Sequence, residues 1–375
     1  MIINRRKALG LMGGTAAVLG MPYVARAATG SVVVVGGGFG GATAAKYLKL
    51  WSPDLNVTLI EPAARFYTCP FSNLYLGGLI DFEAIGHGYD TLAALGVNVV
   101  QAYADDVDTA GKTVTVGGDT LSYDALVLSP GIDIRWGALE GYDEAAAELA
   151  PHAWKAGPQT QLLRSQLEAM PDGGTFVLVA PDNPFRCPPG PYERVSLIAH
   201  YFKTQKPASK IVILDAKDAF SKQGLFTAGW QALYGDMIEW VSRTNDGRVV
   251  RVDAANLTVE TEFGRTVTAD VLNVVPPQQA GLIAQRAGVT NEAGWVPVKP
   301  ATFESQLAEG VYVVGDATVA APMPKSGFSA CSQGKFVASA IIASLDGSEP
   351  LPAKWANTCY SLVGPDYGIS VAGVY

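Results

Sequence analysis

The chain has 375 residues, of which 49% are hydrophobic and 17% charged, and its formal net charge is −8. A chain of this length and composition can bury a large core, and we expect two or three domains. Its acidic balance argues against nucleic acid or an anionic membrane surface as a partner. A basic protein partner is compatible with this charge.

The first 27 residues have the pattern of an export signal. They contain the pair Arg5-Arg6, a short apolar stretch and the cleavage-site pattern Ala25-Arg26-Ala27, which together are typical of a twin-arginine signal. The alternative, an uncleaved membrane anchor, fits less well because the apolar stretch is short and rich in glycine. We therefore expect a periplasmic protein with no membrane span after the signal. Cleavage removes four basic residues and no acidic ones, which leaves a net charge of −12.

The segment from residue 31 to residue 61 has the order of a dinucleotide-binding unit. A buried-strand run, 31–35, precedes a glycine-rich turn, a helix to about Leu50 and a second strand that ends at Glu61. Such glycines allow a tight turn and a close backbone approach to a pyrophosphate at the helix N-terminus, and Glu61 is placed to accept from a ribose hydroxyl. We interpret the G-x-G-x-x-G glycines as cofactor-binding residues rather than as an ordinary turn: Gly36, Gly38 and Gly41.

The same kind of unit occurs twice along the chain. The first unit continues with short alternating strands around Gly117-Gly118 and the apolar run 125–128. The second has a strand at 175–180, a helix to about Phe202, a strand ending at Asp215 and alternating strands at about 247–277. This repetition predicts an α/β fold with two Rossmann-like domains. The predicted boundaries are 28–150 and 281–345 for the two parts of the first domain, 151–280 for the second domain and 346–375 for the start of a C-terminal domain.

The segment 311–317 indicates which dinucleotide is bound. Its strand ends in Gly315-Asp316 and resembles the strand that reaches the ribityl chain of FAD in two-domain flavoproteins of the disulfide reductase superfamily. In that setting Gly315 allows close approach and Asp316 accepts from a hydroxyl of the flavin's sugar alcohol; the alternative for Asp316 is a helix cap. Together with Gly131, in the turn after the strand 125–128, this segment predicts FAD as the cofactor.

The turn after the strand 175–180 differs from the first one. It reads "APDNPFRCPPGPYER". Four of its prolines remove backbone N–H donors that a phosphate cradle needs, and their rings fill the space of a pyrophosphate: Pro184, Pro188, Pro189 and Pro191. The second domain is therefore expected to keep the Rossmann frame without binding a nicotinamide nucleotide.

Four cysteines in an exported protein have two readings. They can form two structural disulfides, or Cys187 in the proline-rich turn and Cys359 near the C-terminus can form a redox disulfide over the flavin. Such a disulfide accepts hydrosulfide: one sulfur keeps the added atom as a persulfide, and the other, as thiolate, passes electrons to the flavin. The residues by themselves support both readings equally.

Taken together, these segments and others along the chain resemble those of the flavoprotein subunit of flavocytochrome c sulfide dehydrogenase, a relative of the sulfide:quinone oxidoreductases. The resemblance runs nearly from end to end and rests on the segments "VVVVGGGFGG", "FYTCPFSN", "FRCPPGPYER", "VYVVGDA", "MPKSGFSA", "SQGK" and "NTCYSL" with "PDYGISV". Several of these segments are more specific than any general flavin fingerprint.

The resemblance implies roles for particular residues. In that family the cysteine that matches Cys69 is bonded to the flavin 8α-methyl group, and the cysteines that match Cys187 and Cys359 form the redox-active disulfide. The glutamate that matches Glu193 is an acid/base near the sulfur site. Without the resemblance, Cys69 reads as a buried cysteine and Glu193 as a first-turn carboxylate that complements a helix dipole.

Other candidate residues are less specific. Lys325 precedes a helix whose N-terminus is expected to face the flavin pyrimidine edge, where it would stabilise an anionic reduced flavin; it could equally be a solvated surface lysine. Cys331 is expected to be a packing residue on that helix. The histidines have no metal-ligand spacing, and we expect no metal site: His87, His152 and His200.

The resemblance implies FAD-dependent oxidation of sulfide to sulfur or polysulfide, with electrons passing to a c-type cytochrome subunit in a heterodimer. No CxxCH haem-attachment pattern occurs in the sequence, so the haem would belong to the other chain. The alternatives are an enzyme of the sulfide:quinone oxidoreductase type and a non-catalytic flavin electron-relay partner of a sulfur-oxidation system. Because chains of that family continue beyond the position of Tyr375, the C-terminal domain is expected to be incomplete.

Overall fold

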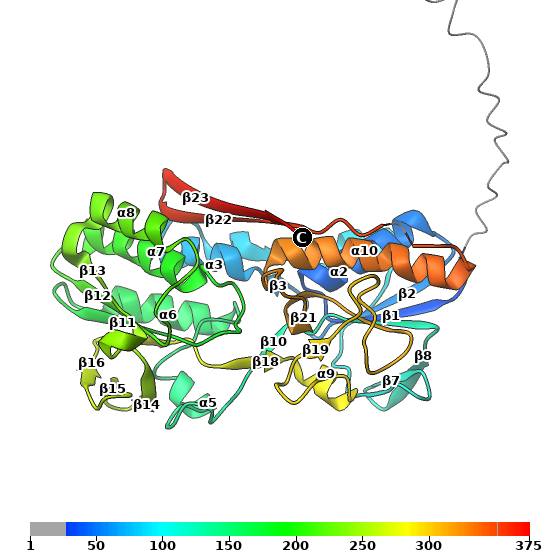
Figure 1. Cartoon of the computed structure of the whole chain (residues 1–375), viewed down its shortest axis with the longest axis horizontal. Helices are drawn as coiled ribbons and strands as arrows, with labels where there is room; N and C mark the ends of the chain where they lie inside the picture. The colour runs from blue at the N-terminus through cyan, green and yellow to red at the C-terminus, as the bar shows by residue number, and fades with distance from the viewer. Residues whose placement is uncertain (1–27, 351) are drawn as a thin grey trace, which may run out of the picture.

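The computed structural model describes residues 28–350 and 352–375, so the predicted export signal lies outside the described residues. Two α/β lobes lie side by side, and a long hairpin runs across the top of both (Figure 1). None of the helices in the described ranges has the length and hydrophobicity needed to span a bilayer.

The first lobe is built on a five-stranded parallel sheet in the order β20-β9-β1-β2-β5. Its strands are short valine- and leucine-rich runs that are buried on both faces, as parallel sheets require. Helices α2 and α10 pack against one another above the sheet. The bounds are β1 Ser31–Val35, α2 Phe39–Trp51, β2 Asn56–Ile60, β5 Asn98–Val100, β9 Ala125–Leu128, β20 Val311–Val313 and α10 Gly327–Asp346.

The second lobe repeats this plan with one strand fewer. Its parallel sheet has the order β13-β12-β11-β17, with β11 in the position of β1. The predicted α/β fold with two Rossmann-like domains is confirmed. The bounds are α6 Pro158–Ala169, β11 Thr175–Ala180, α7 Gly190–Gln205, β12 Lys210–Asp215, α8 Gln223–Tyr234, β13 Ile238–Val241 and β17 Val271–Val274.

Each lobe also carries a three-stranded antiparallel meander, β6-β7-β8 in the first and β14-β15-β16 in the second. Their bounds are β6 Asp106–Asp108, β7 Thr113–Val116, β8 Asp119–Ser122, β14 Val249–Asp253, β15 Thr258–Thr261 and β16 Thr266–Thr268. The smaller elements are β3 Phe66–Tyr67, α3 Cys69–Leu76, β4 Gly86–His87, α4 Asp90–Ala94, α5 Glu144–Ala147, α9 Leu282–Arg286, β19 Val296–Pro297, β21 Thr318–Val319 and the 3₁₀ turns η1 Phe82–Ile85, η2 Gly235–Met237, η3 Arg243–Asn245 and η4 Gly315–Ala317.

The chain crosses between the lobes on an antiparallel pair of strands, β10 (Ile132–Ile134) and β18 (Gln278–Ala280). Downstream of β10, Leu139, Tyr142 and Ala150 already pack into the core of the second lobe with strands β11 and β17. The first crossing therefore lies at β10 and not at residue 150, because a few apolar side chains outside any long element decide which core a connecting segment joins.

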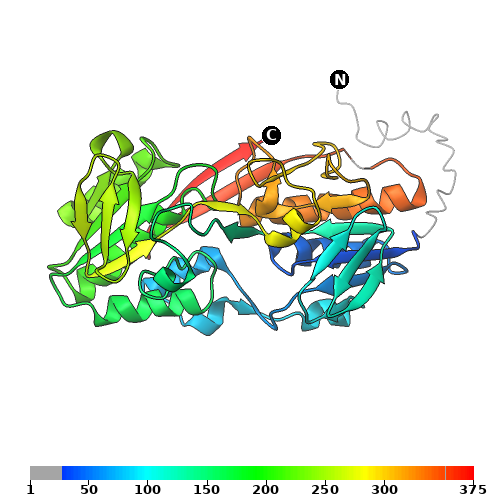
Figure 2. The ribbon, with the colours of Figure 1, turned by 90° about the horizontal axis from the view of Figure 1, so that it is seen from below.

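The C-terminal residues form the hairpin β22 (Ala356–Gly364) and β23 (Tyr367–Val374). In both views the hairpin extends along the two lobes, from α8 at one end toward α10 at the other (Figures 1 and 2). Strand β22 contacts α7 and α8 of the second lobe as well as α10 of the first. Residues near the C-terminus are thereby brought to the boundary between the lobes.

Candidate active site

The turn between β1 and α2 has the close packing that its glycines predict. A Cβ at Gly36 would collide with the carbonyl of Ser129, and a Cβ at Gly41 would collide with the carbonyl of Gly36. A Cβ at Gly38 would meet only the ring of Phe66, at 3.6 Å, so the backbone at Gly38 is open to a ligand. This division of the three positions is the one a pyrophosphate-binding turn needs.

Two further features of this turn fit a dinucleotide. Helix α2 has no side-chain cap and no acidic residue in its first turn, so its N-terminal N–H groups are available to a pyrophosphate. The carboxylate of Glu61 lies beside the turn, where it accepts from the N–H groups of Gly37 at 2.8 Å and Ala63 at 2.9 Å. Glu61 is therefore fixed at the edge of the position that a ribose would occupy.

Buried polar atoms without partners mark the rest of a cofactor path. The described part of the chain offers no hydrogen-bond partner to Asp316 Oδ1, Thr68 Oγ1 or Trp154 Nε1. Burial also raises the pKa of Asp316, although Arg186 and Lys325 act in the opposite direction. Unpaired buried polar groups are costly, and a polyhydroxylated flavin nucleotide would supply the missing partners. These residues fit FAD, with Asp316 placed to accept from a ribityl hydroxyl.

A cavity of about 210 Å³ lies where the two lobes meet. It is lined by the proline-rich turn of the second lobe and by residues of the first that include Trp295, Gly315, Lys325 and Gln333. The Lys325 ammonium donates to the carbonyls of Asp316 at 2.8 Å and Thr318 at 2.6 Å and lies 3.8 Å from the centre of the Trp295 ring.

The environment of Lys325 is not that of a solvated surface lysine, which was one of its two interpretations. Burial lowers its pKa to about 8, while the Asp316 carboxylate acts in the opposite direction. The side chain instead contributes positive charge to the wall of the cavity, just before the N-terminus of α10. Gly131, with φ +66°, has open space at its Cβ position, as a turn that faces a ligand requires.

Three N–H groups of the proline-rich turn of the second lobe donate to acceptors within the protein. The N–H of Arg186 donates to Gln278 Oε1, that of Cys187 to the carbonyl of Lys325, and that of Gly190 to the carbonyl of Cys187. A phosphate group bound here would have to displace all three. The turn therefore joins the two lobes instead of forming an anion site.

The acid at the end of β12 is also occupied. Asp215 is completely buried and accepts from the hydroxyl of Tyr192 at 2.5 Å, the indole of Trp240 at 3.0 Å and the ammonium of Lys217 at 2.6 Å. The ring of Phe220 stacks on Tyr192 with 3.6 Å between ring centroids. In the first lobe the equivalent position belongs to Glu61, which faces a glycine turn.

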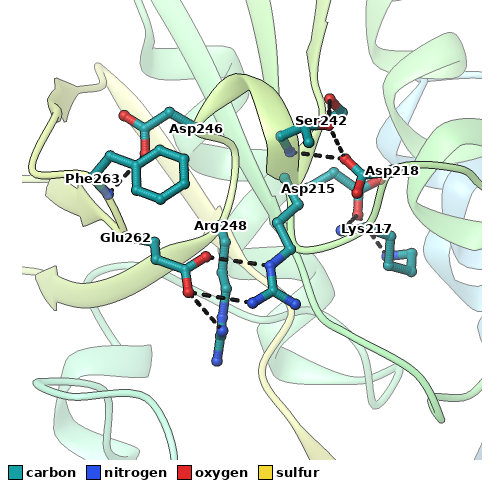
Figure 3. A network of polar contacts seen from close by, with 10 residues as sticks. Asp215, Lys217, Asp218, Ser242, Asp246, Arg248, Glu262 and Phe263 are labelled. Carbon is teal, nitrogen blue, oxygen red and sulfur yellow. Dashed lines mark hydrogen bonds and ion pairs between the residues drawn. The ribbon is translucent and has the colours of Figure 1, made fainter.

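Figure 3 shows Asp215 and Lys217 within a larger polar network of the second lobe. The carbonyl of Lys217 accepts from the N–H of Arg243, and the Arg243 and Arg248 side chains share the carboxylate of Glu262. The network ties the end of the parallel sheet to the meander β14-β15-β16, so side chains and loop backbone fill this edge of the sheet.

Cys187, Cys359 and Glu193 form the second part of the site. Cys187 lies in the proline-rich turn with φ +56°, a left-handed conformation that strains a residue with a side chain. Glu193 is in the first turn of α7 and accepts from the N–H of Leu362 on β22 at 2.8 Å and from Asn73 on α3 at 3.2 Å. The carboxylate thus holds β22, which carries Cys359, over the helix that begins just after Cys187.

The electrostatics of this group differ from those of exposed side chains. Burial raises the pKa of Glu193 to about 7, although the hydrogen bonds from Leu362 and Asn73 and the charge of Lys222 act in the opposite direction. Burial is also the main cause that raises the pKa of Cys187 and of Cys359. A negative charge on Cys359 would raise the pKa of Cys187 further, which means that the two sulfurs lie within electrostatic reach of one another.

All four cysteines are free thiols in the structure, so neither the two structural disulfides nor the redox disulfide is formed. Cys331 lies on α10 with its sulfur 3.7 Å from the carbonyl of Phe39, in a packing position between α10 and α2. Cys187 and Cys359, by contrast, lie in the same site although they are far apart in sequence.

Cys69 begins helix α3 at the boundary between the lobes, and its thiol donates to the carbonyl of Trp154 at 3.5 Å. Burial lowers the pKa of Arg194 to about 10, and the charges of Cys69 and Cys187 both raise it. One buried guanidinium is thus within electrostatic reach of both sulfurs. Cys69 also directly follows Thr68, whose buried hydroxyl has no partner in the described part of the chain.

Two further residues, Lys222 and Asn357, are functional candidates that the sequence alone did not indicate. The Lys222 ammonium donates to the carbonyl of Cys359 at 3.1 Å and to Ser361 Oγ at 2.7 Å. Burial raises the pKa of Cys359, and Asn357, two residues away on the same strand, acts in the opposite direction. Asn357 could have been found because side chains two residues apart share a strand face, but Lys222 is 137 residues from Cys359 and its segment has no pattern that marks it.

The histidines have structural surroundings. His152 is buried and accepts from the N–H of Trp154 at 2.9 Å, and burial lowers its pKa to about 3. Within the described ranges there is no cluster of three or more metal-ligating side chains.

Comparison with family models links three parts of the chain to known proteins. Residues 160–276 match the central part of the sulfide dehydrogenase [flavocytochrome c] flavoprotein chain, and residues 351–375 match the flavocytochrome c sulphide dehydrogenase flavin-binding family. Residues 30–168 match the pyridine nucleotide-disulphide oxidoreductase family.

Individual relatives give the same picture. The chain is 24% identical to the mitochondrial sulfide:quinone oxidoreductase of Mus musculus over 312 residues, which are 76% of this chain and 65% of that protein. It is 26% identical to the sulfide-quinone reductase of Aquifex aeolicus, over 79% of this chain and 70% of that protein. Over 45 residues, 12% of this chain, it is 64% identical to the sulfide dehydrogenase [flavocytochrome c] flavoprotein chain of Chlorobaculum thiosulfatiphilum and covers 94% of that sequence.

Solved structures agree with the fold. The sulfide:quinone oxidoreductase of Aquifex aeolicus superposes with a TM-score of 0.76 at 21% identity, covering 92% of this chain and 87% of that one. Putidaredoxin reductase, in its covalent complex with putidaredoxin, superposes with a TM-score of 0.70 at 19% identity over 92% and 81% of the two chains. Fold and site together define a two-domain flavoprotein of the disulfide reductase type. Within that class, the chain belongs with the flavoproteins of the flavocytochrome c sulfide dehydrogenase and sulfide:quinone oxidoreductase type.

Proposed function

We propose that this protein oxidises sulfide to sulfur or polysulfide at the Cys187–Cys359 pair and passes the electrons through FAD to a c-type cytochrome subunit in the periplasm. The observation that carries the proposal is the hydrogen bond by which Glu193, a carboxylate with a pKa of about 7, holds the strand of Cys359 over the helix that begins just after Cys187. A relative of the same family is named as a sulfide dehydrogenase flavoprotein chain, and others as sulfide:quinone oxidoreductases.

The sulfur step is a thiol–disulfide exchange. Hydrosulfide forms a new S–S bond with one sulfur of the oxidised pair, the bond between the two cysteines breaks, and the other cysteine leaves as a thiolate. Glu193 takes the remaining proton of the added sulfur, for which a carboxylate that titrates near neutral pH is well suited. The added sulfur loses two electrons in total, and FAD supplies a two-electron acceptor when it is bound.

The residues of the first lobe would hold the cofactor. The pyrophosphate fits the N-terminus of α2 at Gly38, Glu61 would accept from the ribose, and Asp316 would accept from the ribityl chain. Cys69 is proposed to form the covalent link to the flavin, on the basis of the family resemblance and of its position at the lobe boundary.

The filled nucleotide position of the second lobe supports the direct use of a small donor. The bound N–H groups of the proline-rich turn and the buried Asp215 leave no ready place for a nicotinamide nucleotide. Electrons would therefore enter at the thiol pair.

Anaerobic titration of the flavin absorbance tests the proposal. Sulfide should bleach the flavin of the purified protein. A flavin that sulfide leaves oxidised would contradict sulfide oxidation and favour a non-catalytic electron-relay role. After acid precipitation, the flavin should remain with the protein pellet, and a Cys69→Ser variant should release it; release from the wild-type protein would disprove the link without affecting the sulfide chemistry.

The acceptor distinguishes this proposal from its main alternative, a quinone-reducing enzyme. The matches at residues 160–276 and 351–375 favour a cytochrome partner, whereas the longer relatives carry the name of quinone reductases. Sulfide-reduced protein should reduce a c-type cytochrome faster than a short-chain quinone, and the reverse order would establish the alternative.

Recovery of the protein in the periplasmic fraction, lost when Arg5 and Arg6 are both changed to Lys, tests the proposed export route.

A further inference from the structure

Lys222 is held in an unusual conformation beside the thiol pair. It precedes the first residue of α8 and has φ +62° and ψ +24°, the left-handed conformation that a residue with a side chain rarely adopts. Such a conformation is sterically unfavourable and persists where surrounding contacts impose it. Here the Lys222 ammonium is held by hydrogen bonds to the carbonyl of Cys359 and to Ser361 Oγ.

The contacts of β22 show what Lys222 adds. At one end, Asn357 Oδ1 accepts from Ser326 Oγ at 2.6 Å and from Ser329 Oγ at 3.1 Å, both at the N-terminus of α10. At the other end, Glu193 accepts from the N–H of Leu362. Cys359 lies between these two anchors, where it pairs with Val371 of β23 and its carbonyl accepts from Lys222.

The charged and polar groups around Cys187 and Cys359 have different effects on a negative charge at the two sulfurs. Glu193, Cys359 and Asp316 disfavour a negative charge on Cys187, and Arg186 favours one. At Cys359, Lys222 and Asn357 favour the negative charge and Glu193 disfavours it. Burial lowers the pKa of Lys222, whereas negative charge on Cys359, Glu193 and Cys187 favours its protonated form. The Lys222 ammonium, held by the carbonyl of Cys359 and by Ser361 Oγ, thus lies within electrostatic reach of the Cys359 sulfur.

We propose that Lys222 is a positioning residue for Cys359, which fixes the strand that carries this cysteine and holds negative charge on its sulfur. This inference rests on the proposed function, in which opening of the disulfide by hydrosulfide leaves Cys359 as either a thiolate or a persulfide anion. Both species carry a single negative charge that an ammonium stabilises. In this role the Lys222 ammonium changes the stability of the charged sulfur and takes no part in proton transfer.

The ionisation of Cys359 provides a test that does not depend on sulfide oxidation. In the reduced, flavin-containing protein, alkylation by iodoacetamide at a series of pH values, quantified at each cysteine by mass spectrometry, reports the thiolate fraction. Lys222→Met should move the midpoint for Cys359 upward by about one pH unit or more, because an adjacent opposite charge is lost. Lys222→Arg, which keeps the charge, should restore most of the wild-type midpoint.

Lys203 offers a matched control. It is an exposed lysine of α7 whose ammonium donates to the carbonyl of Leu233 at 2.8 Å, a lysine-to-carbonyl contact like that of Lys222 but away from the thiols. Lys203→Met should leave the Cys359 midpoint unchanged. If Lys222→Met does not fold, Lys222→Gln removes the charge while keeping a hydrogen-bond donor and carries the same test.

The outcomes separate the two proposals. An unchanged Cys359 midpoint in the Lys222 variants would overturn the inference, whatever the activity of the protein. A shifted midpoint in a protein whose flavin is not reduced by sulfide would support the role of Lys222 and contradict the proposed function. If both hold, Lys222→Met should slow sulfide-dependent flavin reduction about 10- to 100-fold, and Lys222→Arg should recover most of the rate.

Discussion

The two lobes share one frame, but the first strand of each leads into a different kind of turn. After β1, three glycines leave the backbone at Gly38 open and the N-terminus of α2 uncapped. After β11, the turn that contains Cys187 has four prolines, and its N–H groups bind acceptors within the protein. The first turn is shaped to receive a ligand, whereas the second holds a side chain in place.

The acids that follow the second strand of each sheet show the same contrast. Glu61 accepts two backbone N–H groups at the edge of the glycine turn. Asp215 is fully buried among Tyr192, Trp240 and Lys217. The same position in the same fold thus faces an open glycine turn in one lobe and lies in the core of the other, so a Rossmann frame by itself does not determine what is bound.

The largest effect should come from the turn of the second lobe. Cys187→Ser removes one sulfur of the exchange, and we expect sulfide-dependent flavin reduction to fall by at least about a thousandfold. Stopped-flow absorbance of the flavin measures this rate. Cys331→Ser is the matched control, since that thiol lies between α10 and α2; retention of the rate in Cys187→Ser would show that the turn has no catalytic role.

Exchanging the two acids for amides sharpens the comparison next. Asp215→Asn should lower the free energy of unfolding by about 3 kcal/mol, because Lys217 is left buried without its counter-charge, and should leave FAD content unchanged. Glu61→Gln should do the reverse and weaken FAD binding with little change in stability. Denaturant unfolding and flavin absorbance per protein distinguish them. Equal effects in both variants would show that the two acids have the same role.

The third prediction concerns the pH dependence of stability. Burial raises the pKa of Glu193 from 4.5 to about 7, so the folded protein binds a proton more tightly than the unfolded chain. The stability that comes from this group is complete below about pH 4.5 and is lost as the pH rises through 7, a difference of about 3 kcal/mol. In Glu193→Gln this part of the dependence should disappear, as unfolding at several pH values between 4.5 and 8 would measure. The exposed Glu239→Gln should leave the profile unchanged.

The smallest expected effect is none at all. Addition of NADH to the oxidised protein under anaerobic conditions should leave the flavin spectrum unchanged, because prolines and bound N–H groups occupy the turn that would receive its pyrophosphate. Bleaching of the flavin by NADH at a rate similar to that with sulfide would break the comparison between the lobes. It would show that the second turn opens to a nucleotide.

The sequence predicted the parts of the fold that depend on local pattern. The strands at 31–35, 125–128 and 175–180 have the predicted bounds, since continuous apolar runs between turn residues define buried parallel strands. The sequence placed the first crossing between the lobes at residue 150 and not at β10. Its position depends on where isolated apolar residues such as Leu139 and Tyr142 pack.

The candidate site divides in the same way. Glycines at fixed spacing, the acid at residue 61 and the Gly315-Asp316 pair are local signals, so they could be read from the sequence alone. Lys222 and the hydrogen bond between Glu193 and the N–H of Leu362 have no such signal, because each joins segments more than a hundred residues apart.

The sequence by itself therefore determined the two-domain frame and the contrast between a glycine-rich first turn and a proline-rich second one, since these follow from the backbone properties of glycine, proline and apolar runs. Only the tertiary structure decided that Cys359 lies over the turn of Cys187, with Lys222 and Asn357 beside it. Which charges surround a buried sulfur depends on how β22 packs against α7, α8 and α10. Such electrostatic surroundings arise from contacts between distant segments, which residue spacing does not encode.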